Sequence, residues 1–208
     1  MNQHKWKNVL LTSDGFYDND NKPRKPLIER LAKMLNKPFC EAKAIFIPTA
    51  ALTPDDKNLE YVQRCKNNLL LLGILPENIF HYDIDGSLSK QNAMMFDIIF
   101  FTGGNTPYLG KRVRETDFGE IIKHMVYNSK VYVGISAGSM LAMQDFNVDN
   151  LSETSPREFT GLGFIKVYFT VHCAPGTQPR SDLPLPHIAL TDNQALAVSW
   201  NGYEIIDG

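Results

Sequence analysis

Ser136 is the residue of this chain whose surroundings most clearly suggest chemistry. It stands in a Gly-x-Ser-x-Gly motif, residues 134–138, directly after an apolar run that begins at Val131. Such a run, followed by small residues, is typical of a buried strand that turns sharply into a helix. Larger side chains at Gly134 and Gly138 would collide in so tight a turn. The turn holds the serine hydroxyl clear of the sheet, so we expect Ser136 to be a nucleophile.

A serine hydroxyl needs a neighbouring base, and that base needs an orienting group. Among five histidines, His172 is the best candidate base, because it closes a predicted strand at residues 164–171 and precedes a loop. Of the other four histidines, His4 is expected in the polar start of the chain and His124 in a helix. His81 and His187 are expected in or beside strands. Four acids could orient the base, and sequence spacing alone does not separate them: Asp145, Asp149, Glu153 and Asp192.

An acyl-transfer site also requires donors for the developing oxyanion. The backbone N–H of Ala137 is one candidate, and a second could come from Gly104 or Asn105 in the glycine-rich turn after residues 97–101. The glycines do not follow the Gly-x-Gly-x-x-Gly spacing of a dinucleotide site. Ser139 is a rival hydroxyl, but its helical position should turn it away from the exposed turn.

Strand and helix patterns alternate along most of the chain, which predicts an α/β fold with a mainly parallel sheet and helices on both faces. The expected strands are residues 8–12, 44–48, 78–82, 97–101 and 131–135, and the expected helices are residues 26–35, 53–72, 89–95, 107–114, 118–128 and 140–143. Three short strands follow, and the last two form a hairpin at Asn201-Gly202. Both glycine-rich turns would lie at the carboxyl ends of strands, where such sheets bind ligands.

Composition limits the class of protein. The 208 residues fit one domain, residues 1–208, and the net charge of −2 without a basic stripe disfavours nucleic-acid binding. No apolar run approaches a membrane span, and three separated cysteines favour reduced thiols in the cytoplasm. Because Cys65 shares the apolar face of residues 53–72 with Leu59, Val62, Leu69 and Leu72, we expect it in the core. No cluster has metal-ligand spacing, so no metal and no cofactor is expected.

Residues 100–106, the motif at residues 134–139 and a strand that ends in His172 resemble the dipeptidase E and cyanophycinase family of serine peptidases. The resemblance covers nearly the whole chain and implies a flavodoxin-like fold of the class I glutamine-amidotransferase type. It implies Ser136 as nucleophile and His172 as general base. Asp192 fills the place of the family's orienting glutamate, and Asp149 falls near another acidic position considered for the triad.

The resemblance implies a small peptide as substrate. From composition we expect no nucleic-acid or membrane partner, and we expect a monomer or homodimer. Dipeptidase E has a longer, arginine-containing segment between its histidine and its acid, and it prefers an N-terminal aspartate. Here residues 173–191 are proline-rich, and Arg180 is their only arginine. The preference for an N-terminal aspartate is therefore not expected to carry over. Two alternatives stay open: an esterase or amidase that uses the same serine, and a non-catalytic protein that binds a ligand in the same crevice.

Overall fold

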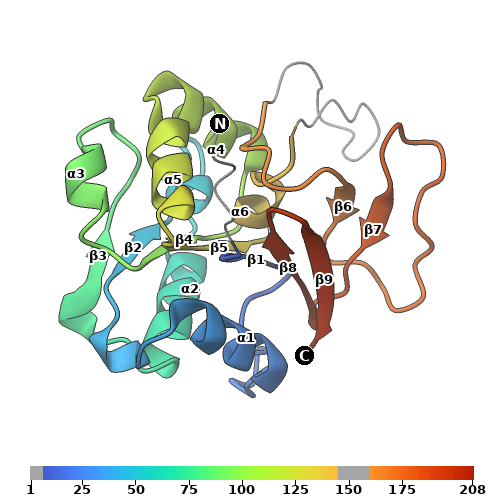
Figure 1. Cartoon of the computed structure of the whole chain (residues 1–208), viewed down its shortest axis with the longest axis horizontal. Helices are drawn as coiled ribbons and strands as arrows, with labels where there is room; N and C mark the ends of the chain where they lie inside the picture. Colours follow the sequence, from blue (N-terminus) through green and yellow to red (C-terminus); the bar gives the residue numbers. More distant parts are fainter. Residues whose placement is uncertain (1–6, 145–159) are drawn as a thin grey trace.

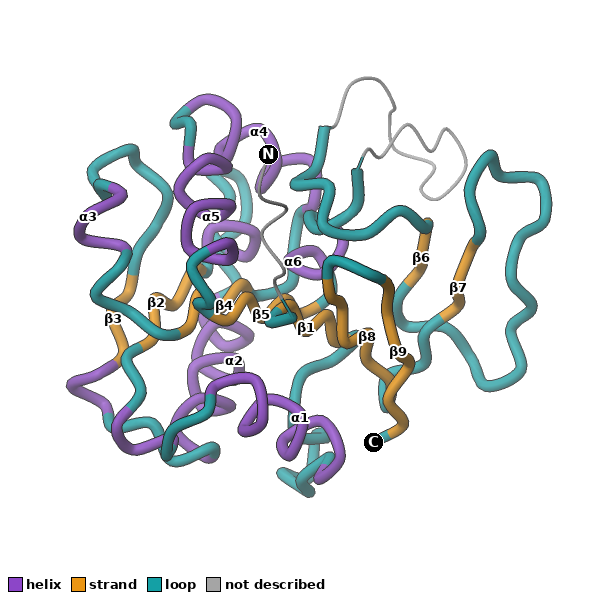
Figure 2. Tube along the Cα trace, in the orientation of Figure 1, coloured by secondary structure: helices purple, strands orange, loops and turns teal. Residues whose placement is uncertain are grey.

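A mixed sheet forms the centre of the computed structural model, which describes residues 7–144 and 160–208. Among these residues the sheet has seven strands in the order β3-β2-β4-β5-β1-β8-β9 (Figures 1 and 2). Their bounds are β1 Val9–Thr12, β2 Ala44–Ile47, β3 Ile79–His81, β4 Ile98–Phe101, β5 Val131–Ile135, β8 Gln194–Ser199 and β9 Gly202–Asp207. The first five in spatial order are parallel, and β8 runs antiparallel to both β1 and β9. The predicted α/β class and the late antiparallel hairpin are confirmed.

Helices cover both faces of the sheet, as predicted. α1 (Lys25–Leu35) and α2 (Leu59–Leu71) pack on one face (Figure 1). The opposite face carries α3 (Lys90–Ala93), α4 (Thr106–Glu115), α5 (Phe118–Tyr127) and α6 (Ala137–Met140). Short 3-10 helices lie at Phe39–Glu41, Thr49–Ala51 and Pro76–Asn78. Within the described ranges, no helix combines the length and apolar character needed to cross a membrane.

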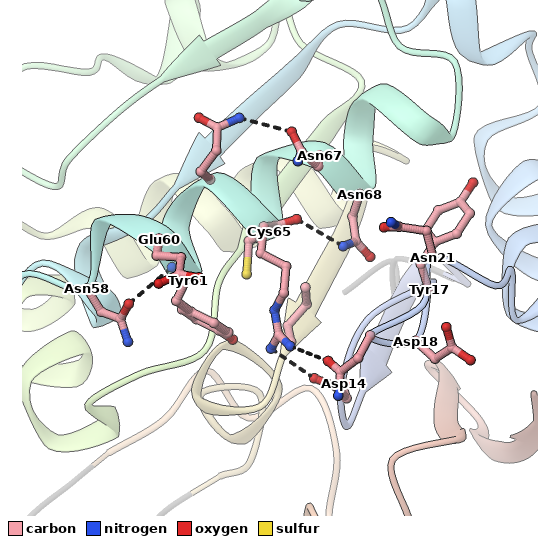
Figure 3. Close-up of a pocket in the computed structure, with 14 residues that line it drawn as sticks. Asp14, Tyr17, Asp18, Asn21, Asn58, Glu60, Tyr61, Cys65, Asn67 and Asn68 are labelled. Atoms are coloured by element: carbon pink, nitrogen blue, oxygen red, sulfur yellow. Dashed lines mark hydrogen bonds and ion pairs between the residues drawn. The ribbon is translucent and has the colours of Figure 1, made fainter.

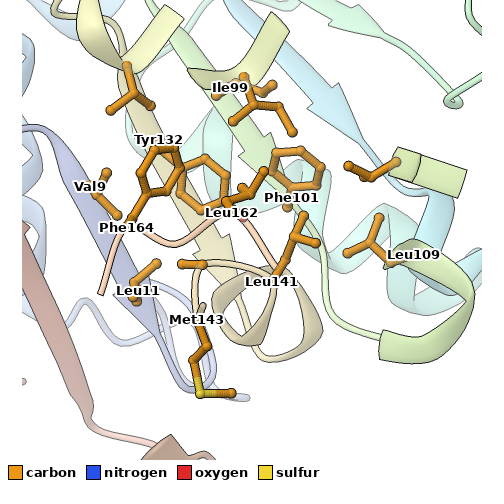
Figure 4. Packing of buried hydrophobic residues seen from close by; sticks show 14 of the residues in the cluster. Val9, Leu11, Ile99, Phe101, Leu109, Tyr132, Leu141, Met143, Leu162 and Phe164 are labelled. Carbon is orange, nitrogen blue, oxygen red and sulfur yellow. The ribbon is translucent and has the colours of Figure 1, made fainter. Parts of the chain in front are cut away.

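Two hydrophobic cores lie on the two sides of the sheet, because successive side chains of a strand point to opposite faces. In β1, Val9 and Leu11 belong to the core under α4, α5 and α6, whereas Leu10 belongs to the core under α1 and α2. Aromatic rings fill much of the first core (Figure 4), where Tyr132 stacks on Phe101 at 5.2 Å between ring centroids. Apolar side chains on both faces therefore fix the register of the central strands.

The start of α2 differs from the prediction. Residues 53–56 form a turn instead of a helix start, because the Thr53 hydroxyl accepts a hydrogen bond from the Asp56 N–H and donates one to its carbonyl. Asn58 caps the helix by accepting from the Tyr61 N–H at 3.1 Å. Leu59 is 66% exposed, so its assignment to the apolar face was wrong, whereas the buried Cys65 confirms the rest of that face.

The strand predicted at residues 164–171 is shorter than expected. Only β6, Tyr168–Thr170, is a strand, and it pairs in parallel with β7, His187–Ala189, in a separate two-stranded sheet. Upstream of β6 the backbone turns toward the segment that follows α6. There the Phe164 N–H donates to the Ala142 carbonyl at 2.9 Å. The α6 helix itself ends at Met140 rather than Met143, since Met143 forms an isolated parallel bridge to Ile165.

The junction of β5 with α6 is as crowded as the small residues predict. A Cβ atom on Gly134 would lie 2.5 Å from the Gly138 backbone carbonyl, and one on Gly138 would lie 2.5 Å from Phe101 Cβ. Neither neighbour is the free end of a flexible side chain. Only glycine therefore allows α6 to pack this closely against β4 and β5.

Gly138→Ala should accordingly destabilise the protein by roughly 1–3 kcal/mol, the usual cost of overpacking. Gly119→Ala is the matched control, because a Cβ there would meet only ordinary contacts, 3.5 Å from Val113 at the closest. Alanine is a better helix former than glycine, so this control should be neutral or slightly stabilising. Urea unfolding of both variants measures the difference; equal stability of the two would contradict the packing argument.

Candidate active site

The β5–α6 turn holds Ser136 in a backbone conformation that few non-glycine residues adopt. Its φ is 48° and its ψ is −108°. The Ser136 N–H donates to the Thr12 carbonyl of neighbouring β1 at 3.1 Å, and the Ser136 carbonyl accepts from the Met140 N–H at 2.9 Å. Strained residues that the surrounding structure holds in place are concentrated at functional sites. The predicted strand-turn-helix geometry is thus present, with Ser136 at its apex.

Ser136, His172 and Asp192 form a continuous chain of polar contacts. His172 Nε2 lies 2.9 Å from Ser136 Oγ, and His172 Nδ1 lies 2.6 Å from Asp192 Oδ1. With Nδ1–H donating to the carboxylate, Nε2 is left to accept the serine proton. The side chains of His172 and Asp192 are 47% and 53% exposed, so a ligand can reach them. The structure therefore brings together three residues that are far apart in the sequence.

His172 reaches Ser136 from a sharp bend that follows β6. The residue has a φ of 58°, in the left-handed region. Two hydrogen bonds hold this bend: the His172 N–H donates to Ser13 Oγ at 2.8 Å, and the Cys173 N–H donates to the Leu190 carbonyl at 2.9 Å. The bend places the imidazole over the carboxyl end of the main sheet even though β6 belongs to the smaller one.

Ser13 is the site residue that the sequence analysis missed. Its hydroxyl accepts from the His172 N–H and donates to Asp192 Oδ1 at 3.1 Å, so one side chain contacts both members of the pair. Ser13 directly follows β1, and the rule that ligands bind at carboxyl ends of strands could have pointed to it. What the sequence does not reveal is that β1 lies between β5 and β8.

Asp192 sits in the short loop between β7 and β8, which other hydrogen bonds hold in place. The Thr191 N–H donates to Gln194 Oε1 at 3.0 Å, and Asn193 Oδ1 accepts from the buried Arg24 side chain at 3.2 Å. Of the four acids proposed from sequence, Asp192 is the one that the structure describes, and it contacts His172. The other three, Asp145, Asp149 and Glu153, lie outside the described residues, as does His4.

The glycine-rich turn after β4 lies directly beside Ser136. A Cβ on Gly103 would lie 3.0 Å from Ser136 Cβ. The Gly103 N–H donates to the Tyr61 hydroxyl at 3.1 Å, and the Asn105 N–H donates to the Ala50 carbonyl at 2.7 Å. Among the described residues, the N–H groups of Gly104 and Ala137 have no such partner. Of the two alternatives for the second oxyanion donor, these contacts favour Gly104 over Asn105.

Other reactive side chains have structural roles. Ser139 is fully buried, and its hydroxyl lies 2.8 Å from the carbonyls of Thr12 and Gly134, so it is not a competing nucleophile. Burial raises the pKa of the Cys65 thiol to about 11, which keeps it protonated at neutral pH. Burial also lowers the pKa of His187, whose Nδ1 accepts from the Arg180 N–H. In the part of the chain that the structure describes, no group of three His, Cys, Asp or Glu side chains could hold a metal ion.

Comparisons with known proteins identify the family of this chain. The model of peptidase family S51 matches residues 9–204. Peptidase E of Shigella flexneri is 30% identical over 132 residues, and an uncharacterized peptidase of Pasteurella multocida (strain Pm70) is 27% identical over 132 residues. These alignments cover 62% and 61% of this chain, and 54% and 63% of the two relatives. The matches therefore span between half and two thirds of these relatives' length.

Two crystal structures share the fold. One is of a protein provisionally named peptidase E from Listeria monocytogenes EGD-e, with a TM-score of 0.70, 18% identity and coverage of 98% of this chain and 99% of that one. The other is of a peptidase from an acI-B1 Actinobacterium, with a TM-score of 0.65, 17% identity and coverage of 99% and 89%. Because the family model spans almost the entire chain, this protein belongs to peptidase family S51.

Proposed function

We propose that this protein is a serine peptidase that hydrolyses short peptides through an acyl-enzyme intermediate. The observation that carries the proposal is the chain of contacts from Ser136 through His172 to Asp192, with separations of 2.9 Å and 2.6 Å. A nucleophile, a base and an orienting acid in this arrangement are the parts that acyl transfer requires. Membership of a peptidase family supports a peptide as the acyl donor.

In the proposed reaction, Ser136 Oγ attacks the scissile carbonyl carbon while His172 Nε2 takes the hydroxyl proton. The N–H groups of Ala137 and Gly104 would donate to the oxyanion of the tetrahedral intermediate. His172 then gives its proton to the leaving amine, and the C–N bond breaks to leave an acyl-serine. A water molecule, deprotonated by His172, hydrolyses this ester and frees Ser136.

The proposal includes no preference for an N-terminal aspartate. Arg180 is the one arginine between His172 and Asp192, and its side chain forms an ion pair with Asp182 in the same loop. Both Nε and a terminal nitrogen of this guanidinium donate to Asp182, so this side of the planar group is not available to an acidic substrate side chain. A substrate screen therefore has to define which residue is preferred on the acyl side of the cleaved bond.

Replacing Ser136 with alanine should abolish peptide hydrolysis and covalent labelling by a fluorophosphonate, because both reactions use the Ser136 oxygen. Labelling followed by intact-mass measurement gives the readout, and Ser87→Ala, which removes an exposed serine hydroxyl from the loop before α3, serves as the control. Labelling that persists in Ser136→Ala would reject the nucleophile assignment.

Asp192→Asn should lower kcat roughly 10²- to 10⁴-fold with little change in KM, because an amide no longer fixes the imidazole tautomer or stabilises the imidazolium. Initial-rate kinetics on a cleaved dipeptide measure the effect. Asp182→Asn, which removes an acid from the loop that precedes Asp192, is the matched control. A kcat within threefold of wild type in Asp192→Asn would exclude Asp192 as the orienting acid.

A panel of dipeptides and simple acyl esters separates the proposed peptidase from an esterase. We expect turnover of at least one class of dipeptide in liquid-chromatography assays of purified protein. Hydrolysis of acyl esters alone, with every dipeptide left intact, would contradict the peptidase proposal while retaining the nucleophile.

A further inference from the structure

A polar cavity of about 640 Å³ lies between α2 and the loop that follows β1 (Figure 3). Volumes of about 300–1,000 Å³ are typical of sites that enclose small ligands. Ile135, the residue before Ser136, lines this cavity, and so does Tyr61, whose hydroxyl accepts from the Gly103 N–H beside Ser136. The cavity therefore borders the turn that carries Ser136.

Two arginines share a single carboxylate in the wall of this cavity. Arg24 and Arg64 each approach Asp14, with N–O separations of 3.3 Å and 3.4 Å. Their surroundings differ, because the Arg24 side chain is 6% exposed whereas that of Arg64 is 50% exposed. Arg24 and Arg64 exceed Asp14 by one positive charge, whereas Asp18 and Glu60 elsewhere in the lining add two negative charges.

Arg64 has more unused hydrogen-bonding capacity than Arg24. All three side-chain nitrogens of Arg24 donate to groups of the protein: Asn193 Oδ1, the carbonyls of Asp14, Gly15 and Tyr17, and the Asp14 carboxylate. Arg64 donates to Asn19 Oδ1 and Asp14, and no described residue accepts from its Nε. Its guanidinium carbon lies 5.1 Å from the centroid of the Tyr61 ring, which orients the charged group.

The other charges of the lining restrict the anion that can bind. Asp18 and Glu60 also line the cavity. Asp18 accepts from the N–H groups of Asp20 and Lys22, so its carboxylate is tied to its own turn. A ligand with two carboxylates would be repelled by these acids, whereas a single carboxylate can pair with Arg64. The α-carboxylate at the end of a peptide fits this pattern better than an acidic side chain.

We propose that this cavity binds the C-terminal residue of a short peptide and that Arg64 pairs with its free α-carboxylate. The inference rests on the proposed peptidase function and assigns the cavity to the leaving-group side of the scissile bond. Planar guanidinium and carboxylate groups can form two parallel hydrogen bonds. The enzyme would then select peptides whose free C-terminus lies close to the cleaved bond.

Arg64→Met tests the assignment on a dipeptide that the wild type cleaves and on the same dipeptide as its C-terminal amide. Methionine keeps an apolar stem beside Tyr61, and Asp14 keeps its pair with Arg24. We expect KM for the free acid to rise roughly 10- to 100-fold with kcat nearly unchanged, since a hydrogen bond to a charged group is lost. KM for the amide should stay within threefold of the wild-type value.

Lys66→Gln is the matched control, because it removes one positive charge from the same helix at a residue that does not line the cavity. It should leave both KM values unchanged. Arg64→Lys retains the charge without the planar fork and should give an intermediate KM for the acid. An equal rise in KM for acid and amide in Arg64→Met, or no rise for either, would overturn the proposal.

Binding to Ser136→Ala, measured by isothermal titration calorimetry, separates this inference from the proposed function. We expect this variant to bind free dipeptides at least tenfold more tightly than their amides, and Arg64→Met in the same background to remove the difference. If the wild type cleaves no peptide, the function fails while this preference still supports the cavity assignment. Equal binding of acids and amides would reject the assignment even in an active peptidase.

Discussion

The carboxyl end of β1 is the constraint on which the rest of the site depends. The Thr12 carbonyl accepts hydrogen bonds from the Ser136 N–H and the Ser139 hydroxyl, which fixes the turn that presents the nucleophile. One residue further on, the Ser13 hydroxyl contacts both His172 and Asp192. Three segments from separate parts of the chain therefore take their positions from Thr12, the last residue of one buried strand, and from Ser13, which follows it.

This arrangement combines a rigid turn around Ser136 with accessible side chains at His172 and Asp192. The turn around Ser136 is locked by backbone contacts so close that glycine is required at Gly134 and Gly138. His172 and Asp192, by contrast, have side chains about half exposed and come from loops at the edge of the sheet. Tight packing beneath Ser136 and open loops around it are the combination that the proposed acyl-transfer reaction requires.

Sequence reasoning succeeded where one local pattern determined the structure. The apolar runs of the parallel strands and the crowded motif around Ser136 could be assigned because each depends on adjacent residues. It failed where distant contacts decided the outcome: the strand predicted at residues 164–171 was shortened by bonding of Phe164 to the segment after α6. The start of α2 was misplaced because Thr53-Pro54 and Asn58 are both good helix caps, and the first closes a turn of its own. The role of Ser13 depends on strand order, which no local pattern encodes.

The position of β1 also has a consequence for biosynthesis. Val9 of this strand pairs with Tyr132 on one side and with Val198 on the other, so its neighbours are translated long after it. Contacts between residues so distant in sequence form slowly and late. Ser13 cannot join Asp192 to His172 until translation has passed residue 192. The contacts among Ser13, His172 and Asp192 therefore belong to a late stage of folding, after residue 192 has left the ribosome.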